Sequence, residues 1–373
     1  MLETKQNWYE VENIDQIDSP ALLVFPERVK ANIQTAIRMV KTADRLRPHV
    51  KTNKSAEATR LMLDAGITKF KCATIAEAEM LGRVKAPSVL LAYQPLGPKL
   101  RRFVELIKNF PATRYACLVD NVDVAREQAT VFLSNGLQVP VYIDINVGMN
   151  RTGIVPDENA INVVQFCNGS AGMTLAGLHV YDGHFRSPDM NVRTMECDQA
   201  FRSIETFRDK LLALGIRVPT IVAGGSPTFP IHARRQEVEC SPGTFVYWDK
   251  GYRDQCREQE FAIAAVLITR IISLPSPTTV CTDLGHKSVA SENEIQSRVF
   301  FLNERHLRPV SQSEEHLVCE VSPDHSYKVG DVLYGIPYHI CPTVALYERV
   351  WTVENNKVVG EWKVVARDRK ISV

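Results

Sequence analysis

Short apolar segments alternate with longer helical patterns over the first two-thirds of the chain, and this alternation constrains the fold most strongly. Helical patterns separate the expected strands, and after Pro26 the residues Val29, Ile33 and Val40 recur on one helical face. The expected strands are 21–25, 45–50, 69–74, 88–93, 115–120, 139–146, 175–183 and 219–225. About eight such units in roughly 240 residues match a closed (β/α)8 barrel. An open doubly wound sheet is the rival fold, but no G-x-G-x-x-G motif follows the first strand.

The pattern changes near residue 255, where strand-like segments separated by turn-rich stretches replace the helices. We therefore expect an α/β barrel domain over residues 14–255 and a smaller all-β domain over residues 256–373. The segment NWYEVENI resembles a strand, so residues 1–13 are a candidate addition to the second domain.

Composition excludes several classes of protein. Lys and Arg number 44 against 43 Asp and Glu, so nothing in the charge balance suggests a nucleic acid or an anionic membrane as partner. The sequence has no apolar run long enough to span a bilayer, and its N-terminal residues lack the apolar stretch of a secretory signal. Nine cysteines without a C-x-x-C pair favour a reduced, cytoplasmic setting over a disulfide framework.

Two segments at the expected mouth of the barrel carry groups suited to pyridoxal phosphate. Active sites of such barrels lie at the C-terminal ends of the strands, and Lys51 directly follows strand 45–50. A lysine amine shielded from water there can form a Schiff base with an aldehyde. The glycines of GGSPT, residues 224–228, allow backbone N–H groups to approach a phosphate closely. Taken singly, a surface lysine and a tight turn are the alternatives; together the two segments describe a pyridoxal-phosphate site.

His339 and Cys341 form a second group, in the segment YGIPYHICPTVAL. If this segment is extended, positions i and i+2 project to the same face, so an imidazole and a thiolate could share one metal ion. Such a pair favours zinc over magnesium or calcium, with manganese or another divalent ion as the alternative. A buried cysteine beside a packed histidine is the purely structural alternative.

The order of six motifs resembles the fold-type III pyridoxal-phosphate enzymes that include D-threonine aldolase and eukaryotic-type D-serine dehydratase. RPHVKTNK, residues 47–54, is similar to the family signature R-P-H-x-K-T-H-K. The motifs IDSPALLV, Y-D-G-H, GGSPT, E-x-x-P-G-T and H-I-C-P-T also recur in the family's order, so the resemblance covers roughly residues 8–370. It implies an alanine-racemase-like (β/α)8 barrel followed by a β-domain, usually as a homodimer.

The resemblance also implies roles for individual residues. Lys51 would be the catalytic lysine that carries the cofactor, and Tyr181 and His184 would lie near the ring and the substrate as further catalytic residues. Arg151 would contact the phenolic oxygen of the cofactor. The phosphate would be held by Gly225, Ser226, Gly243 and Thr244. The metal pair of the dehydratase branch corresponds to His339 and Cys341.

Two positions depart from the family pattern. Asn53 stands where the signature has its second histidine, so the rate or substrate range is expected to differ if that histidine supports the cofactor. Phe245 stands where the family commonly has tyrosine, and Tyr247 is the candidate to supply the hydroxyl near the pyridine nitrogen.

The expected function is a lyase acting on a small D-3-hydroxy amino acid, with a 2-oxo acid and ammonia as products from D-serine or D-threonine. Aldol cleavage to glycine and acetaldehyde is the close rival on the same scaffold. A racemase would need a second acid–base group, a tyrosine in alanine racemases, where H-x-C stands here. A non-catalytic pyridoxal-phosphate carrier of the single-barrel type would lack the second domain.

Overall fold

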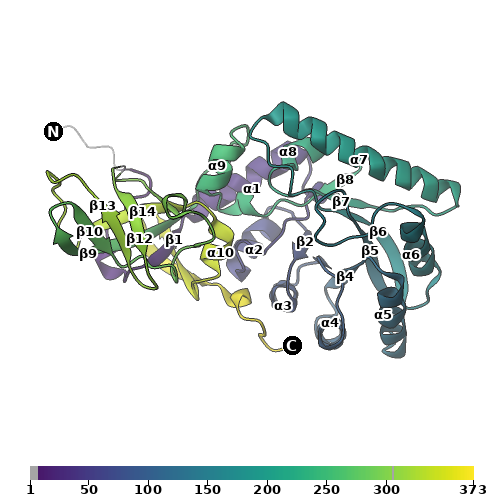
Figure 1. Ribbon diagram of the computed structural model, residues 1–373. Helices are drawn as coiled ribbons and strands as arrows, with labels where there is room; N and C mark the ends of the chain where they lie inside the picture. The colour runs from purple at the N-terminus through teal and green to yellow at the C-terminus, as the bar shows by residue number, and fades with distance from the viewer. Residues whose placement is uncertain (1–6, 305) are drawn as a thin grey trace.

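The computed structural model describes residues 7–304 and 306–373. A helix-rich part and a strand-rich part lie side by side in Figure 1. The helix-rich part contains a curled parallel sheet of seven strands in the order β2-β3-β4-β5-β6-β7-β8. These strands are β2 (Lys69–Cys72), β3 (Ser88–Leu91), β4 (Arg114–Val119), β5 (Val139–Ile145), β6 (Met173–Val180), β7 (Ile221–Ala223) and β8 (Val238–Cys240).

The segment 46–50 joins the two ends of this sheet. Leu46 forms a parallel bridge to Cys240 of β8, and His49 forms one to Lys71 of β2. Backbone hydrogen bonds of 2.8 and 2.9 Å accompany the bridges. The ring therefore closes with this segment as its eighth member, and the expected alanine-racemase-like barrel is confirmed.

Helices follow the strands and cover the outside of the barrel (Figure 1). They are α1 (Pro26–Val40), α2 (Ala56–Asp64), α3 (Ile75–Arg83), α4 (Pro98–Asn109), α5 (Val122–Ser134), α6 (Glu158–Gly169), α7 (Met190–Ala213), α8 (Phe229–His232) and α9 (Lys250–Gln255). The side chains of Asn121, Asp157 and Asp189 accept hydrogen bonds from the first backbone N–H groups of α5, α6 and α7. These caps explain why the helices begin directly after short polar loops.

The first expected barrel strand belongs to the other part of the molecule. Strand β1 (Ala21–Val24) pairs antiparallel with β9 (Ala265–Ser276) and parallel with β15 (Arg349–Glu354). All four residues of β1 are buried, so the strand is apolar on both faces. Such a pattern fits any strand covered on both sides, and the sequence of the strand alone could not identify its sheet.

The second sheet has nine strands, as expected for an all-β part, and β14 and β11 branch from its main order β12-β13-β10-β9-β1-β15-β16. Its remaining members are β10 (Thr279–Thr282), β11 (Val299–Phe301), β12 (Arg308–Gln312), β13 (Leu317–Glu320), β14 (Val332–Pro337) and β16 (Lys357–Lys363). A short helix, α10 (Ile340–Val344), interrupts the strands. The segment containing Cys341 was expected to be extended, and that expectation is wrong, because the chain turns into this helix directly after His339.

The segment NWYEVENI does not form a strand, although its residues pack on the second sheet. The backbone N–H of Glu12 donates to Asn356 O at 2.8 Å, and that of Val11 donates to the Tyr334 hydroxyl at 3.3 Å. Residues 1–6 lie outside the described residues. The boundary near residue 255 stays a prediction; α9 ends at Gln255 and β9 begins at Ala265.

The two parts share one hydrophobic core and a strap formed by the end of the chain. One continuous cluster of buried side chains runs through both parts. Ser372 and Val373 donate their backbone N–H groups to Glu79 of α3 at 3.0 and 3.1 Å. These contacts fix the second part against the barrel, and a site between the two is therefore held by both.

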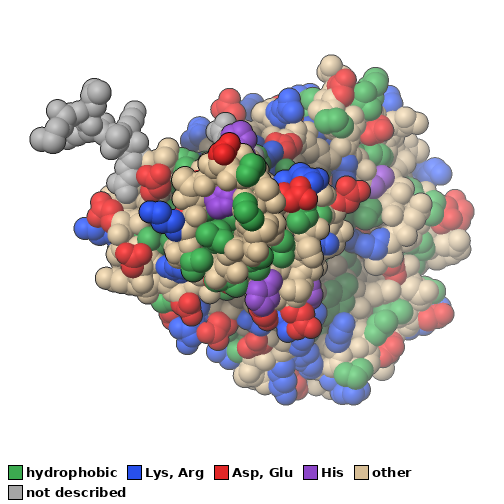
Figure 2. Space-filling view, turned by 60° about the vertical axis from the view of Figure 1, so that its left-hand side comes forward, with side chains coloured by type: hydrophobic (Ala, Val, Ile, Leu, Met, Phe, Trp, Pro, Cys, Tyr) green, Lys and Arg blue, Asp and Glu red, His purple; other side chains and the backbone are tan. Residues whose placement is uncertain are grey.

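The surface carries charges of both signs. On the face shown in Figure 2, basic and acidic side chains are interspersed, without a broad region of one sign. This distribution agrees with the net charge of +1. Within residues 7–304 and 306–373, no helix is both long and apolar enough to cross a bilayer.

Candidate active site

A cavity of about 770 Å³ lies at the C-terminal ends of the barrel strands, between the barrel and the second part. Its wall includes nine of the residues predicted from the sequence: Lys51, Arg151, Tyr181, Gly225, Ser226, Gly243, Thr244, His339 and Cys341. They come from loops that are far apart along the chain, and α10 supplies Cys341. The barrel therefore brings the predicted lysine, the glycine-rich turns and the H-x-C pair to one place.

Lys51 and Lys54 both reach this cavity but differ in their partners. Lys54 forms an ion pair with Glu77, whose side chain is buried. No carboxylate of the described residues lies within ion-pair distance of Lys51. The backbone N–H of Lys51 donates to Nδ1 of His49 at 3.3 Å, and burial lowers the pKa of this histidine well below its usual value. Of these two lysines, Lys51 is therefore the one without a carboxylate partner, and its role as the cofactor lysine stays a prediction.

Two glycine-containing turns face each other across the expected phosphate site. A methyl group added to Gly243 would lie 3.0 Å from the carbonyl oxygen of His49, and one added to Gly225 would lie 3.2 Å from the Tyr181 ring. The backbone N–H of Thr244 donates to the Ser226 hydroxyl at 3.3 Å. Hydroxyl and backbone N–H groups thus converge at these two turns, and a side chain at either glycine would crowd the space. Such an arrangement is suited to binding an anion.

Arg151 lies above the ring of Tyr181, with its guanidinium carbon 4.6 Å from the ring centroid. The loop that carries Arg151 is held internally, because Asn146 accepts backbone hydrogen bonds from Gly148 at 3.0 Å and from Asn150 at 3.1 Å. Stacking on an aromatic face fixes the plane of the guanidinium and leaves its N–H groups free to bind an anionic oxygen.

Two predicted residues do not reach the cavity wall. His184 packs against Phe185, with ring centroids 4.0 Å apart, and against Gly148. Tyr247 is fully buried, and burial raises the pKa of its hydroxyl. Within the described residues, neither the Tyr247 hydroxyl nor Nδ1 of His184 has a hydrogen-bond partner. Their roles stay predictions.

His339 and Cys341 contact each other although the chain between them is not extended. Burial by itself would raise the pKa of the Cys341 thiol, but the hydrogen bond from His339 and the charge of Lys51 lower it. Burial likewise opposes the charge on His339, yet Cys341 and Glu292 raise its pKa to about 9. Thr52 Oγ1 lies 3.0 Å from Cys341 Sγ. A thiol poised to ionise beside an imidazole is a donor pair that suits zinc.

Glu292 binds Nδ1 of His339 and was not predicted from the sequence. A carboxylate on the second nitrogen of a metal-binding histidine fixes the orientation of the ring. Its separation of 47 residues from His339 leaves no local signal in the sequence.

Lys71, His179 and Asp144 form a second group that sequence reasoning missed. Lys71 Nζ lies 3.4 Å from His179 Nε2, and His179 Nδ1 lies 2.7 Å from Asp144 Oδ1. All three side chains are buried, and Lys71 also lines the cavity. They come from the neighbouring strands β5 and β6 and from β2, so only the closed barrel brings them together.

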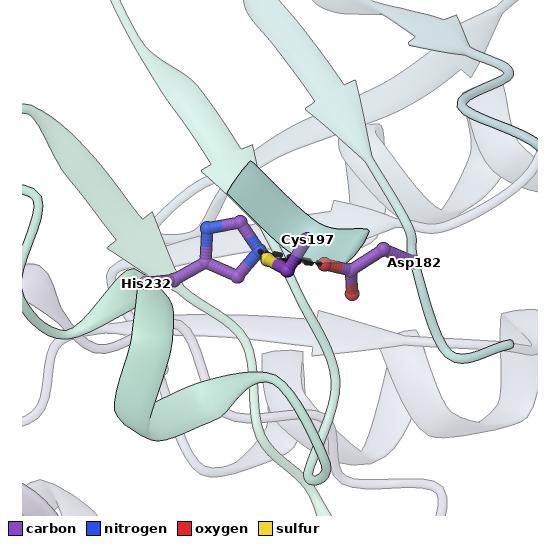
Figure 3. Close-up of side chains that lie close together, drawn as sticks. All are labelled: Asp182, Cys197 and His232. Carbon is purple, nitrogen blue, oxygen red and sulfur yellow. Dashed lines mark hydrogen bonds and ion pairs between the residues drawn. The ribbon is translucent and has the colours of Figure 1, made fainter. Parts of the chain in front are cut away.

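Asp182, Cys197 and His232 form a buried cluster next to the expected phosphate site (Figure 3). His232 Nε2 lies 2.7 Å from Asp182 Oδ2, and Cys197 Sγ lies 3.5 Å from both. These ligand atoms are close enough to hold a metal ion. However, the Arg235 guanidinium lies 2.9 Å from His232 Nδ1 and adds a positive charge that disfavours a second cation.

The cluster has a structural use instead. Asp182 accepts a hydrogen bond from the Thr228 hydroxyl at 2.6 Å, and this hydroxyl accepts one from the backbone N–H of Gly225 at 3.3 Å. Burial would raise the pKa of Asp182, but His232 and Thr228 lower it below its usual value. An ionised Asp182 therefore holds the turn 224–228 in shape.

Fold and cavity together define a pyridoxal-phosphate enzyme built on an alanine-racemase-like barrel. The sequence model for the alanine racemase N-terminal domain matches residues 25–250, and the chain belongs to this family. A model described as a putative serine dehydratase domain matches residues 264–353. The chain is a fold-type III enzyme of the pyridoxal-phosphate-dependent lyase type.

Curated relatives of nearly the same length carry two kinds of name. D-threonine aldolase of Arthrobacter sp is 26% identical over 94% of this chain and 93% of the relative. D-threo-3-hydroxyaspartate dehydratase of Delftia sp. is also 26% identical, over 93% of this chain and 97% of the relative. Among solved structures, D-threonine aldolase from Filomicrobium marinum is similar with a TM-score of 0.86 at 23% identity, covering 94% of this chain and 95% of that one.

Proposed function

We propose that this protein is a pyridoxal-phosphate- and zinc-dependent dehydratase of D-3-hydroxy amino acids such as D-serine or D-threonine. The observation that carries the proposal is the placement of the His339–Cys341 pair on the wall of the same cavity as Lys51. The match of the second part to a putative serine dehydratase domain agrees with it.

The cavity fits the cofactor on its own geometry. Lys51 is available to bind the aldehyde, the turns at Gly225 and Gly243 leave room for the phosphate, and Arg151 offers a cation for the phenolic oxygen. When bound, pyridoxal phosphate withdraws electrons from the α-carbon of an attached amino acid. All remaining chemistry is assigned to the side chains of this chain and the metal.

Lys51 has two tasks in this account. Its amine would hold the cofactor, and its Nζ, when not bonded to the cofactor, would accept the α-proton of the substrate. Arg151, stacked on Tyr181, would stabilise negative charge on the phenolic oxygen of the cofactor. The turns at Gly225 and Gly243 would hold the phosphate, which would keep the α-carbon of each bound substrate near Lys51.

The metal is assigned to the hydroxyl of the substrate. His339 and Cys341 offer one nitrogen and one sulfur, which leaves coordination positions for substrate oxygens. A zinc ion there would withdraw electrons from the β-hydroxyl and favour its departure. One solved structure of a similar dehydratase, with a cysteine replaced by alanine, is described as the metal-free form.

The test is product analysis with D-serine and D-threonine, before and after treatment with a chelator. We expect 2-oxo acid and ammonia, no turnover after chelation, and recovery with added zinc. Glycine and acetaldehyde from D-threonine, without 2-oxobutanoate, would contradict the dehydration. Full activity of a metal-free His339→Ala, Cys341→Ala protein would contradict the metal site.

Aldol cleavage is the second candidate, because three of the curated relatives are named aldolases, two of them for 3-hydroxy-D-aspartate. The same residues would serve it, with the hydroxyl losing its proton and the Cα–Cβ bond breaking. The product analysis separates the two reactions directly.

Compartment and assembly are part of the same proposal. All nine cysteines are free, and eight of them are buried, which supports a reduced cytoplasmic setting. A homodimer is expected from the family resemblance. Sedimentation velocity at micromolar concentration tests this expectation, and a monomer that is fully active would contradict it.

A further inference from the structure

Lys71 is a buried lysine whose side chain lines the active-site cavity without a carboxylate in contact with it. Only 2% of the surface of Lys71 is exposed to solvent. Its Nζ lies 3.4 Å from Nε2 of His179 and 5.8 Å from the ring centroid of Tyr181. A charged amine in such a place is costly, because burial without a counter-ion disfavours the charged form.

A lysine on the same strand shows the usual solution to this cost. Lys69 lies two residues earlier on β2 and points to the opposite mouth of the barrel, where its Nζ lies 2.5 Å from Glu239 Oε1. Lys69 is thus paired in an ordinary ion pair, whereas the amine of Lys71 is held toward the cavity without one. A purely structural position of this kind would be filled at lower cost by an apolar side chain.

His179 and Asp144 fix the environment of the amine. Asp144 Oδ1 lies 2.7 Å from His179 Nδ1, so this nitrogen donates and Nε2 is left to accept from Lys71. Burial lowers the pKa of His179, which keeps the ring neutral and able to act as this acceptor. The three side chains form a series that runs from a carboxylate in the barrel interior to an amine at the cavity.

The charges around Lys71 leave it poised near neutrality. Burial is the main cause that lowers its pKa to about 7, and the neighbouring charge of Lys51 lowers it further, while Asp144 and Asp182 oppose the shift. The titratable and charged groups that face it from the surrounding elements are Lys51, Arg47, His49, Asp144, His179, Tyr181 and Asp182. At neutral pH the amine can therefore both give and accept a proton.

We propose that Lys71 is a second acid–base residue of this active site, with His179 and Asp144 as its positioning residues. This inference rests on the proposed function, because elimination moves two protons and Lys51 accounts only for the one on the α-carbon. In the dehydration, the Lys71 ammonium gives a proton to the departing hydroxyl, the Cβ–O bond breaks, and water leaves. The Lys71 amine then regains a proton from solvent.

The first test compares three single variants of the holoenzyme. Lys71→Met removes the amine and keeps an unbranched side chain, Lys71→Arg fixes a positive charge, and Lys69→Met is the matched control on the same strand. We expect Lys71→Met to lose roughly 100-fold or more in kcat/KM. The ionisation near pH 7 in the pH profile should vanish in both Lys71 variants. The control should keep the wild-type profile.

Cofactor binding separates this role from a structural one. The visible absorption of the cofactor bound to Lys51, and the amount retained per chain, should be the same in Lys71→Met as in the wild type. Loss of this absorption together with the activity would contradict the proposal, because Lys71 would then serve cofactor binding. An unchanged pH profile with activity within twofold of wild type would contradict it as well.

A titration without turnover tests the amine itself. In the cofactor-free full chain, lysines are labelled with ¹³C by reductive methylation, and the Lys71 signal is identified by its loss in Lys71→Met. We expect its chemical shift to change with a midpoint near pH 7. A midpoint above roughly pH 9, close to an ordinary lysine, would overturn the proposal. A wild type that converts no D-3-hydroxy amino acid would contradict the proposed function instead, and this midpoint reports on Lys71 separately.

Discussion

At the scale of single residues, the amines of Lys51, Lys54 and Lys71 reach one cavity but meet different surroundings. Lys54 is neutralised by Glu77, Lys71 is buried beside a histidine, and Lys51 has neither constraint. This difference favours Lys51 over Lys54 as the cofactor lysine, which is also what the resemblance around Lys51 implies, and the assignment stays a prediction. It also predicts different consequences when each amine is removed.

Removing the buried amine of Lys71 should stabilise the cofactor-free protein. Its pKa is about 7 in the folded state against 10.5 in the unfolded chain, so the unfolded chain binds the proton more tightly. Lys71 costs the folded state nothing above pH 10.5, the cost grows as the pH falls from 10.5 to about 7, and it is complete below about 7. Lys71→Met should therefore raise the free energy of unfolding by a few kcal/mol, about 2 to 4, at or below pH 7.

Urea unfolding of the wild type and Lys71→Met at pH 6 and at pH 10 tests whether the substitution raises the free energy of unfolding. The advantage of Lys71→Met should be largest at pH 6 and should shrink at pH 10. An advantage that does not depend on pH would mean that the amine is not the cause. A less stable variant at pH 6 would contradict the burial argument.

Arg151 should tune the spectrum of the cofactor. Its guanidinium is fixed over Tyr181, so its charge stays close to the anionic oxygen that the resemblance assigns to it. Arg151→Ala should shift the visible absorption maximum and weaken cofactor retention about 10-fold or more. Arg151→Lys keeps the positive charge but not the planar guanidinium, so its absorption maximum and cofactor retention should lie between those of the wild type and Arg151→Ala. A spectrum and retention identical to wild type in Arg151→Ala would show that Arg151 is an ordinary surface charge.

At the scale of elements, the turn 224–228 depends on the cluster behind it. Asp182 is buried and bonds both His232 and Thr228, so Asp182→Asn leaves an uncompensated group in the interior. We expect a loss of about 3 kcal/mol in the free energy of unfolding, with weaker binding of inorganic phosphate. Asp198→Asn is the matched control, since Asp198 is half-exposed and, among the residues that the structure describes, forms an ion pair with Arg235 alone. Its cost should stay below about 1 kcal/mol.

Thermal unfolding and phosphate titration of both variants decide this point. If Asp182→Asn unfolds like wild type but loses a zinc ion that the wild type binds, the cluster is a metal site and does not serve to hold the turn.

Much of the architecture could be predicted from local patterns, and the failures have identifiable physical causes. The alternation of strands and helices predicted a barrel of eight members, and seven of the eight expected strands belong to it. The remaining place is taken by β8, which was not predicted as a strand. Strand β1 is buried on both faces, and its partners β9 and β15 lie more than 200 residues away, so no local signal revealed its sheet. The turn into α10 after His339 was missed because apolar and β-branched residues surround it.

The same contrast holds for the site. Residues within short motifs, such as Lys51, Gly225 and Cys341, could be predicted because a motif fixes their position relative to a strand end. Lys71 and His179 carry no motif of their own, and they meet only because β2 and β6 face each other across the closed barrel. Pairings of this kind require the three-dimensional fold.

At the scale of the whole molecule, the end of the chain ties the second part to the barrel. Glu79 is buried on α3 and receives backbone N–H groups from Ser372 and Val373, while Arg369 of the same segment lines the cavity. Glu79→Gln weakens these bonds, and we expect faster proteolysis of residues 368–373 and a loss of about 1 to 3 kcal/mol in stability. Glu105→Gln, on the exposed face of α4, is the control and should leave both unchanged.

Mass spectrometry after limited proteolysis measures the release of the segment. Equal release from Glu79→Gln and from the wild type would show that the strap does not depend on Glu79.

Every role proposed above depends on pyridoxal phosphate being bound to Lys51 in the cavity between the two parts of the chain. The most direct measurement is reduction of the purified holoenzyme with borohydride, followed by peptide mapping by mass spectrometry. We expect one phosphopyridoxyl group per chain, on Lys51, in the peptide that also contains Asn53. A label found instead on Lys54 or Lys71, or on no lysine of this cavity, would contradict it.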